Sequence, residues 1–248
     1  MQSEIAKAHK KNLDALLKAT TQVNRVLNQA IKNKDDLNER IYIRILVMLW
    51  MTWAECKLNS LLTLSQVTKE DIEYIEKNSK NEHARWRLLF DYFFRHRYLG
   101  NNWNKSIDSI NLGRTTFYRY QAVIDLIDNK VALFIEIRNR LAHGQWHIAL
   151  NYDLSAQNPQ LTQTLWRLTK TDVLILKRLL IVLSGIISDL ISSKSAFEKN
   201  FDQRLRTLDL ATSQFEGRME QLRDFLLSRK YKRAISCYDE HETDAGYR

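Results

Sequence analysis

Glycine and proline are scarce in this sequence, which has six Gly and one Pro among 248 residues. A protein built from β-strands needs turn residues at about every 8–12 positions, whereas long helices need few. The hydrophobic fraction of 44% and the charged fraction of 27% are those of a folded globular protein. The composition therefore argues against an all-β fold and against a disordered chain, and it predicts an all-α protein.

Cysteine is also scarce. The sequence contains two cysteines, Cys56 and Cys237, which lie far apart in the chain. This arrangement matches neither a disulfide framework nor a zinc-binding pattern, and it fits a reducing compartment. Residues 1–18 lack the apolar segment of a secretory signal. We therefore expect a cytoplasmic protein.

Apolar runs long enough to cross a membrane are missing as well. The run 41–53 is too short to span a bilayer and contains Arg44, while the run 173–191 is interrupted by Lys177 and Asp189. Both runs are predicted to form buried core helices. No membrane span is expected.

Positive charge, by contrast, is in excess, with a formal net charge of +9 and a pI near 9.5. Basic proteins bind polyanions such as RNA because Lys and Arg displace the counterions of the phosphates. An acidic membrane surface would explain the charge equally well. Charge alone leaves the partner open.

Apolar residues recur at helical spacing through most of the chain. Asp35 and Asp36 interrupt the first stretch, Gly100 and Gly144 are placed to end two others, and Thr115 is a candidate N-cap. The predicted helices span 3–34, 37–64, 70–77, 82–98, 115–143 and 172–233. The second helix is apolar nearly all round, which places it at the centre of a bundle. The segment 145–153 is predicted to be extended or a small hairpin.

We divide the chain into a helical bundle over 1–195, a helical extension over 196–235 and a tail over 236–248 that is predicted to be disordered. Apolar residues of the extension follow spacings of four, three and seven: Phe201, Leu205, Leu208, Phe215, Met219, Leu222 and Leu226. This spacing is typical of a coiled coil or a dimer contact. A helix that folds back on its own bundle would show it too, so both arrangements remain open.

The segment EIRNRLAHG, residues 136–144, pairs Arg138 with His143 at a spacing of four intervening residues. Roughly one such Arg–His match is expected by chance in a sequence this rich in Arg, and Arg140 with His147 makes a second. Context favours the first pair. His143 lies at the predicted helix end, where the helix dipole favours a protonated imidazole.

Arg138 also continues an expected buried stripe that includes Ile127, Val131, Ile135 and Ala142. Arginine is seldom fully buried without a partner or a task. Structural explanations remain open: Arg138 can extend from the apolar face to solvent or pair with a buried carboxylate such as Glu55. His143 can be a simple helix cap.

The RNRLAHG segment, at the end of a long core helix in an all-α chain, resembles the signature of the HEPN superfamily. The signature is an Arg, a polar residue that is often Asn, a few further residues and then a His. The resemblance is specific over about ten residues. It implies an up-and-down helical bundle of HEPN type, here followed by a long C-terminal helical extension. It also implies a homodimer in which two motifs face one another.

Many HEPN proteins are metal-independent endoribonucleases of toxin–antitoxin, phage-defence and RNA-processing systems. The resemblance assigns Arg138 to the scissile phosphate, His143 to proton transfer and Asn139 to positioning. The expected products carry 2′,3′-cyclic phosphate and 5′-hydroxyl ends. No cofactor and no metal are required, and the sequence contains no convincing set of metal ligands. RNA, a second copy of the chain and an antitoxin or defence-complex partner are the expected partners.

Further residues are weaker candidates for the same site. Glu55 is a candidate to orient Arg138, Glu136 can pair with Arg140 at i,i+4, and His147 follows the motif closely enough to line a cleft. The candidate RNA-binding residues are Arg140, Arg95 and Arg97, although a solvated basic face explains them as well. Some HEPN toxins carry a tyrosine two residues after the histidine that is modified for control. Gln145 occupies that position, so this control is not expected.

Two other function classes remain open. A HEPN-like module without catalytic activity would bind nucleic acid or nucleotide, or serve in assembly. A helical adaptor would present its basic face to a membrane or a partner protein, with Arg138 purely structural. The nuclease predicts an accessible basic cleft around Arg138, whereas the adaptor predicts an Arg138 saturated by a buried carboxylate.

Overall fold

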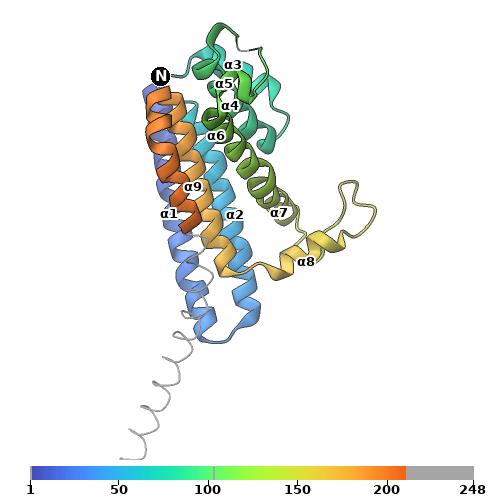
Figure 1. Cartoon of the computed structure of the whole chain (residues 1–248). Coiled ribbons are helices and arrows are strands. Elements are labelled where there is room, and N and C mark those ends of the chain that lie inside the picture. The colour runs from blue at the N-terminus through green and yellow to red at the C-terminus, as the bar shows by residue number, and fades with distance from the viewer. Residues whose placement is uncertain (1, 103, 211–248) are drawn as a thin grey trace, which may run out of the picture.

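The computed structural model describes residues 2–102 and 104–210, and the regular elements within these ranges are helices (Figure 1). They are α1 (Gln2–Lys32), α2 (Asp36–Leu61), α3 (Lys69–Asn78), α4 (Glu82–Tyr98), η1 (Gly100–Asn102), α5 (Ser109–Leu112), α6 (Arg114–Asp125), η2 (Leu126–Val131), α7 (Ala132–Ala142), α8 (Pro159–Arg167) and α9 (Lys170–Ser192). A further helix spans 194–210. The prediction of an all-α fold is confirmed.

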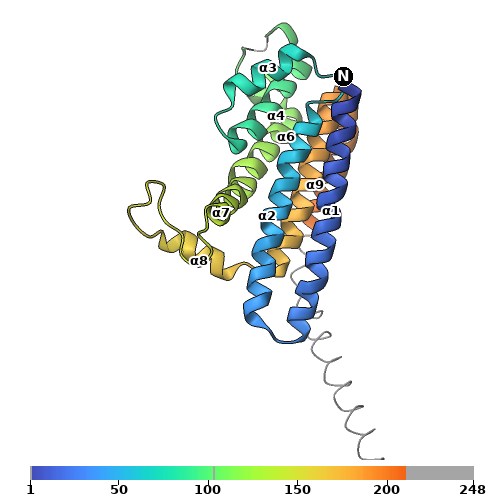
Figure 2. The same cartoon turned by 180° about the vertical axis from the view of Figure 1, so that it is seen from behind.

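The helices α1 and α2 form a long antiparallel hairpin (Figures 1 and 2). Lys34 adopts a positive φ of 54° in the turn, and the Asp35 side chain caps α2 by accepting a hydrogen bond of 3.1 Å from the Asn38 backbone N–H. The helix α2 packs against α1, α7 and α9. Its nearly continuous apolar surface is therefore buried on several sides, which confirms the predicted central position.

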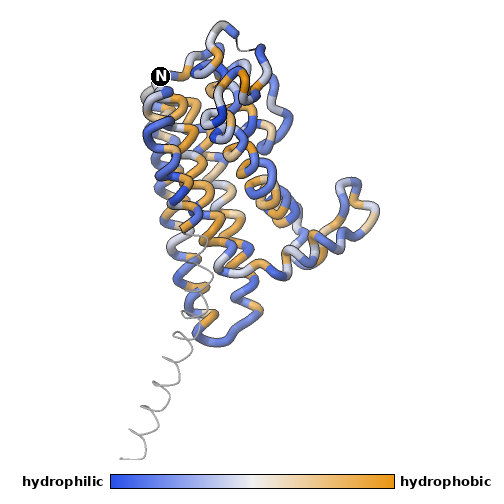
Figure 3. Tube along the Cα trace, viewed as in Figure 1, coloured by the Kyte–Doolittle hydropathy of each residue, from blue (hydrophilic) through white to orange (hydrophobic). Residues whose placement is uncertain are grey.

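Hydrophobic positions are concentrated along α9, which runs through the middle of the bundle (Figure 3). Val173, Leu176, Leu180 and Leu183 on this helix are all buried. No helix in the described part of the chain is long and apolar enough to cross a membrane. The two apolar runs noted in the sequence are thus accounted for by packing in α2 and α9.

The predicted continuous helix over 172–233 is wrong at its start and is interrupted within its length. Thr169 is the N-cap of α9, so the helix begins before the predicted start at 172, and Asp172 completes the capping box from the first turn. The helix ends at Ser192, Ser193 is extended, and the chain turns back into the helix 194–210. Sequence periodicity missed this break because neither glycine nor proline marks it.

The helix 194–210 returns along α9 and is fixed there by charge and by aromatic packing. Arg204 donates two hydrogen bonds, of 2.6 and 3.1 Å, to the Asp189 carboxylate. Phe201 is buried, and buried Phe197 contacts Phe94 of α4 edge-on with the ring centroids 6.1 Å apart. The part of the extension that the structure describes therefore folds back on its own bundle. Residues 211–248 lie outside the described residues, and they hold the predicted tail and the remaining seam positions Phe215, Met219, Leu222 and Leu226.

The predicted helix over 115–143 forms as α6, η2 and α7 in direct succession, beginning at Arg114 with Gly113 rather than Thr115 as N-cap. The segment η2 is a π-helical turn. A π turn inserts extra residues into the helical repeat and is often found near functional sites. Its insertion rotates the downstream face: Ile137 and Leu141 are buried, Arg138 is half-buried, and Ala142 is exposed instead of lying on the expected stripe.

The segment between α7 and α9 projects from the bundle and contains α8 (Figure 1). The helix α8 was not predicted from the sequence; it is short and begins directly after its cap, Asn158. Leu161 and Leu165 anchor it by burial. The predicted hairpin over 145–153 is reduced to a single bridge between Leu150 and Gln157.

Candidate functional site

The last turns of α7 carry the three residues of the predicted catalytic motif. Arg138 is half-buried, while Asn139 and His143 are exposed. His143 is the C-cap residue of α7, and its backbone N–H donates a hydrogen bond of 3.1 Å to the Asn139 carbonyl. Gly144 follows with a φ of +77°, the left-handed conformation that ends helices. The predicted helix end is confirmed.

Arg138 is held by carboxylates from two other helices. Its Nη2 donates to Oε2 of Glu82 at the start of α4, and it lies 3.6 Å from Oε2 of Glu55 on α2. The side chain of Glu82 is 10% exposed, that of Arg138 23% and that of Glu55 52%. Glu82 is thus the principal partner, and Glu55, which the sequence analysis proposed, is a peripheral one.

No local sequence signal identifies Glu82 as a partner of Arg138, because it stands 56 positions earlier and resembles an ordinary first-turn residue after the Asn81 cap. Burial raises the pKa of the Glu82 carboxyl above its usual value, and the nearby Arg138 opposes that shift. Oε1 of Glu82 is buried and has no hydrogen-bond partner among the described residues. The pair is therefore incompletely satisfied.

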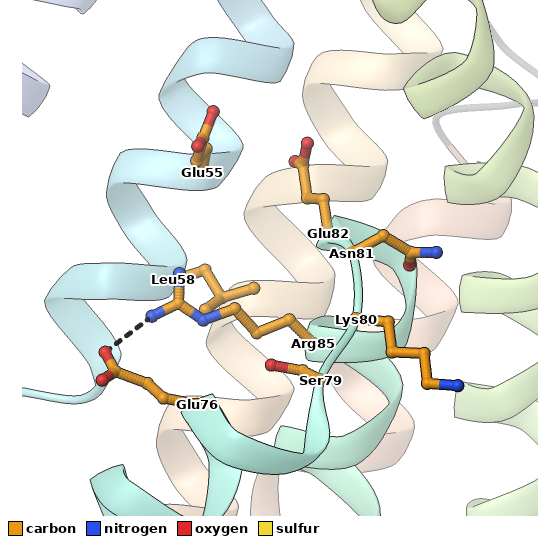
Figure 4. A pocket seen from close by; sticks show the side chains of 8 residues that line it. All are labelled: Glu55, Leu58, Glu76, Ser79, Lys80, Asn81, Glu82 and Arg85. Atoms are coloured by element: carbon orange, nitrogen blue, oxygen red, sulfur yellow. Dashed lines mark hydrogen bonds and ion pairs between the residues drawn. The ribbon is translucent and has the colours of Figure 1, made fainter.

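Glu82 and Glu55 line a cavity of about 320 Å³ between α2, α3 and α4. Figure 4 shows their carboxylates on one side of the cavity and Arg85 extending across it toward Glu76. The Arg85 guanidinium lies 3.5 Å from the Glu76 carboxylate, so this second pair neutralises itself. The surroundings of Arg138 thus carry more carboxylates than free cations.

The chain after His143 is held in place by backbone and side-chain hydrogen bonds. Trp146 donates from its indole N–H to the Leu141 carbonyl at 2.9 Å, and the buried Gln145 accepts from the Leu150 backbone at 2.8 Å. The His143 imidazole itself makes no hydrogen bond within the described residues. It is therefore presented to solvent from a fixed backbone.

The two residues of the second Arg–His match each contact other partners. Arg140 lies 3.6 Å from the Glu136 carboxylate, as expected for an i,i+4 pair, and donates to the Asn151 carbonyl at 3.4 Å. His147 instead packs edge-on against Trp166 of α8, with the ring centroids 4.6 Å apart.

Arg95 and Arg97, the other predicted RNA-binding residues, are tied into the fold. Arg95 donates to Asp91 at 2.7 Å, and the same carboxylate accepts from the Tyr120 hydroxyl at 2.6 Å. Arg97 donates to the backbone carbonyls of Leu190 and Ile191 at the end of α9. A cation at a helix C-terminus satisfies carbonyls that lack intrahelical partners, so Arg97 has a structural role.

A group of basic and aromatic side chains that was not predicted from the sequence lies where α2 meets α8. Arg40 and Arg44 lie over the ring of Trp166, with their guanidinium carbons 5.1 and 5.2 Å from its centroid. The i,i+4 spacing of the two arginines was a visible signal for a shared face. Their common aromatic neighbour was not, because α8 was not predicted.

Comparison of the chain with protein-family models, with curated proteins and with solved structures finds no match. Among the residues that the structure describes, no three His, Cys, Asp or Glu side chains are grouped so as to hold a metal ion. The functional interpretation therefore rests on the RNRLAHG segment and on the contacts described above.

Proposed function

We propose that this protein is a metal-independent endoribonuclease of HEPN type that acts as a homodimer. The observation that carries the proposal is the arrangement at the end of α7. There a half-buried, carboxylate-oriented Arg138 is followed by an exposed Asn139 and by an exposed His143 on a fixed helix end.

Each residue of the motif has a defined task in this reaction. Arg138 stabilises the charge that grows on the phosphate. One copy of His143 takes the proton of the RNA 2′-hydroxyl, whose oxygen attacks the adjacent phosphorus, and the copy from the second protomer protonates the departing 5′-oxygen. Asn139 positions the phosphate. The bond that breaks is the one between phosphorus and the 5′-oxygen, which leaves a 2′,3′-cyclic phosphate and a 5′-hydroxyl.

The dimer is part of the proposal for a geometric reason. Residues five apart on an ideal helix are separated by about 140° around its axis, so Arg138 and His143 of one copy diverge. A second α7 facing the first brings His143 of one protomer toward Arg138 of the other. We further propose that the protein acts in the cytoplasm, in a toxin or phage-defence role, under the restraint of an antitoxin or defence-complex partner.

A second function is favoured by one specific observation, the engagement of Arg138 by Glu82 with Glu55 close by. Two carboxylates beside one guanidinium repel a phosphate. If this arrangement persists in the working protein, the chain is a HEPN-like module without catalytic activity that binds nucleic acid or nucleotide, or that serves in assembly.

RNA cleavage in the presence of EDTA separates the two functions. The informative variants are Arg138→Lys, which keeps a cation against Glu82, and His143→Ala. The control is Lys130→Ala, an exposed position on the same continuous helix. The nuclease predicts cyclic-phosphate ends from wild type and the control, and a loss of about a hundredfold or more in both motif variants. Wild type that leaves RNA intact, as a purified homodimer, favours the non-catalytic module.

A further inference from the structure

Arg40, Arg44 and Trp166 form a cluster at the junction of α2 and α8, here called the Arg–Trp cluster. The Trp166 indole N–H donates to the His147 carbonyl at 2.9 Å. His147 stands four residues after His143, so this hydrogen bond connects the cluster directly to the segment that carries the end of the motif. Figures 1 and 2 both show α8 beside the end of α7 and the lower part of α2.

Among the described residues, no acidic group forms an ion pair with this cluster. Arg44 is 6% exposed, yet its only hydrogen bond within the described residues is one of 3.5 Å from Nη2 to the Leu165 carbonyl. Its Nε is buried and has no hydrogen-bond partner within residues 2–102 and 104–210. No ion pair of the described residues includes Arg40 or Arg44. The neighbouring Glu39 acts instead on Lys170, whose pKa it raises against the effect of burial.

Two cations held together without an anion repel one another. Like charges at i and i+4 on a helix are unfavourable, and burial followed by the neighbouring Arg40 lowers the pKa of Arg44. The indole face offsets part of this cost through cation–π attraction. A bound anion between the guanidinium groups would offset the rest.

We propose that the Arg–Trp cluster binds the phosphates of a single RNA strand on its way to His143. The proposal rests on the proposed function, since it assigns the substrate path of the same site. Guanidinium groups present a planar fork of donors that matches phosphate oxygens, and arginine next to an aromatic ring is typical of single-strand binding. A bilayer surface fits less well because the nearly buried Arg44 lies below the reach of a flat headgroup layer.

The test measures the affinity of a short fluorescent oligouridine for the full-length chain in a His143→Ala background, which removes cleavage. Arg40→Gln is compared with Arg114→Gln, an exposed arginine at the start of α6. Figure 1 shows α6 in the upper part of the molecule, away from α8. One phosphate contact to a single strand contributes a salt slope of about 0.7, which corresponds to about fivefold in affinity at about 0.1 M salt. Arg40→Gln should therefore reduce both the affinity and the salt slope by these amounts, and Arg114→Gln should change neither.

Arg44→Lys provides a second variant that keeps the charge but not the planar donors. It should weaken binding while the unliganded protein unfolds at an unchanged urea concentration. Equal affinities for Arg40→Gln and Arg114→Gln would overturn the proposal, as would the absence of RNA binding in the His143→Ala background. The proposal would also be overturned if Arg40→Gln reduced binding to phosphatidylserine vesicles but not binding to the oligouridine. If Arg40→Gln weakens RNA binding but wild type does not cleave RNA, the nuclease proposal is rejected and the proposed RNA-binding site is retained.

Discussion

Arg138 and Arg44 both lie largely inside the fold, but their surroundings differ in charge. Arg138 meets the Glu82 carboxylate and approaches Glu55. Arg44 meets the face of Trp166 and a single carbonyl at 3.5 Å. The first guanidinium is neutralised by its own protein, whereas the second keeps its full charge. An incoming phosphate must compete with a carboxylate at Arg138, whereas no carboxylate within the described ranges is paired with Arg44.

Under the two proposals, this difference places substrate capture and catalysis at two different parts of the molecule. A strand of RNA would be held mainly at the Arg–Trp cluster, where charge is free, and only then reach Arg138. Binding at the cluster positions the phosphate, so that the weaker attraction at Arg138 is sufficient. The two proposals together therefore predict that substrate capture and catalysis are separable by mutation.

The largest expected contrast comes from replacing each arginine by methionine, which preserves much of the side-chain volume. Arg138→Met leaves the buried Glu82 carboxylate without its partner and should reduce the free energy of unfolding by about 3–5 kcal/mol. Arg44→Met removes a cation that has no acidic partner in the part of the chain that the structure describes. It should be neutral or stabilising, because an apolar side chain at this buried position carries no charge to desolvate.

Urea denaturation of the two methionine variants at neutral pH measures this contrast. A shift of the midpoint without a change in slope reports stability alone. Equal losses for both variants would mean that Arg44 has an acidic partner in solution, and the distinction between the two sites would then disappear.

The helices were predicted well from the sequence where capping or turn residues mark their ends, as at the turn before α2 and at Gly144. The prediction failed where the deciding contact is distant in sequence. The π turn η2 rotated the face of α7, and neither Glu82 nor Trp166 carries a local signal for its partner. The motif could thus be located from sequence, but the charges around Arg138 could not, since they depend on how α2, α4 and α7 pack together.

A smaller contrast is expected within the cavity beside Arg138. Glu82→Ala removes the principal partner of Arg138 but leaves Glu55 at 3.6 Å, so the loss in the free energy of unfolding should be about 2 kcal/mol. Glu76→Ala breaks the pair with Arg85, in which the Glu76 side chain is 60% exposed, and should cost less than about 1 kcal/mol. Thermal or urea unfolding compares the two alanine variants directly, and equal losses would show that burial does not distinguish the two pairs.

The smallest effect concerns pH, and it tests the burial of Glu82 most directly. Because burial raises the pKa of Glu82 in the folded state, folding favours its protonated form. That contribution is fully present below the unfolded pKa, for which the ordinary value is 4.5, and it is lost as pH rises through the folded pKa. Stability measured against pH should therefore fall more steeply above that value in wild type than in Glu82→Gln, which cannot titrate. Parallel curves would mean that Arg138 compensates fully for the burial of the Glu82 carboxylate. A phosphate could then bind Arg138 only by breaking a stable Arg138–Glu82 ion pair.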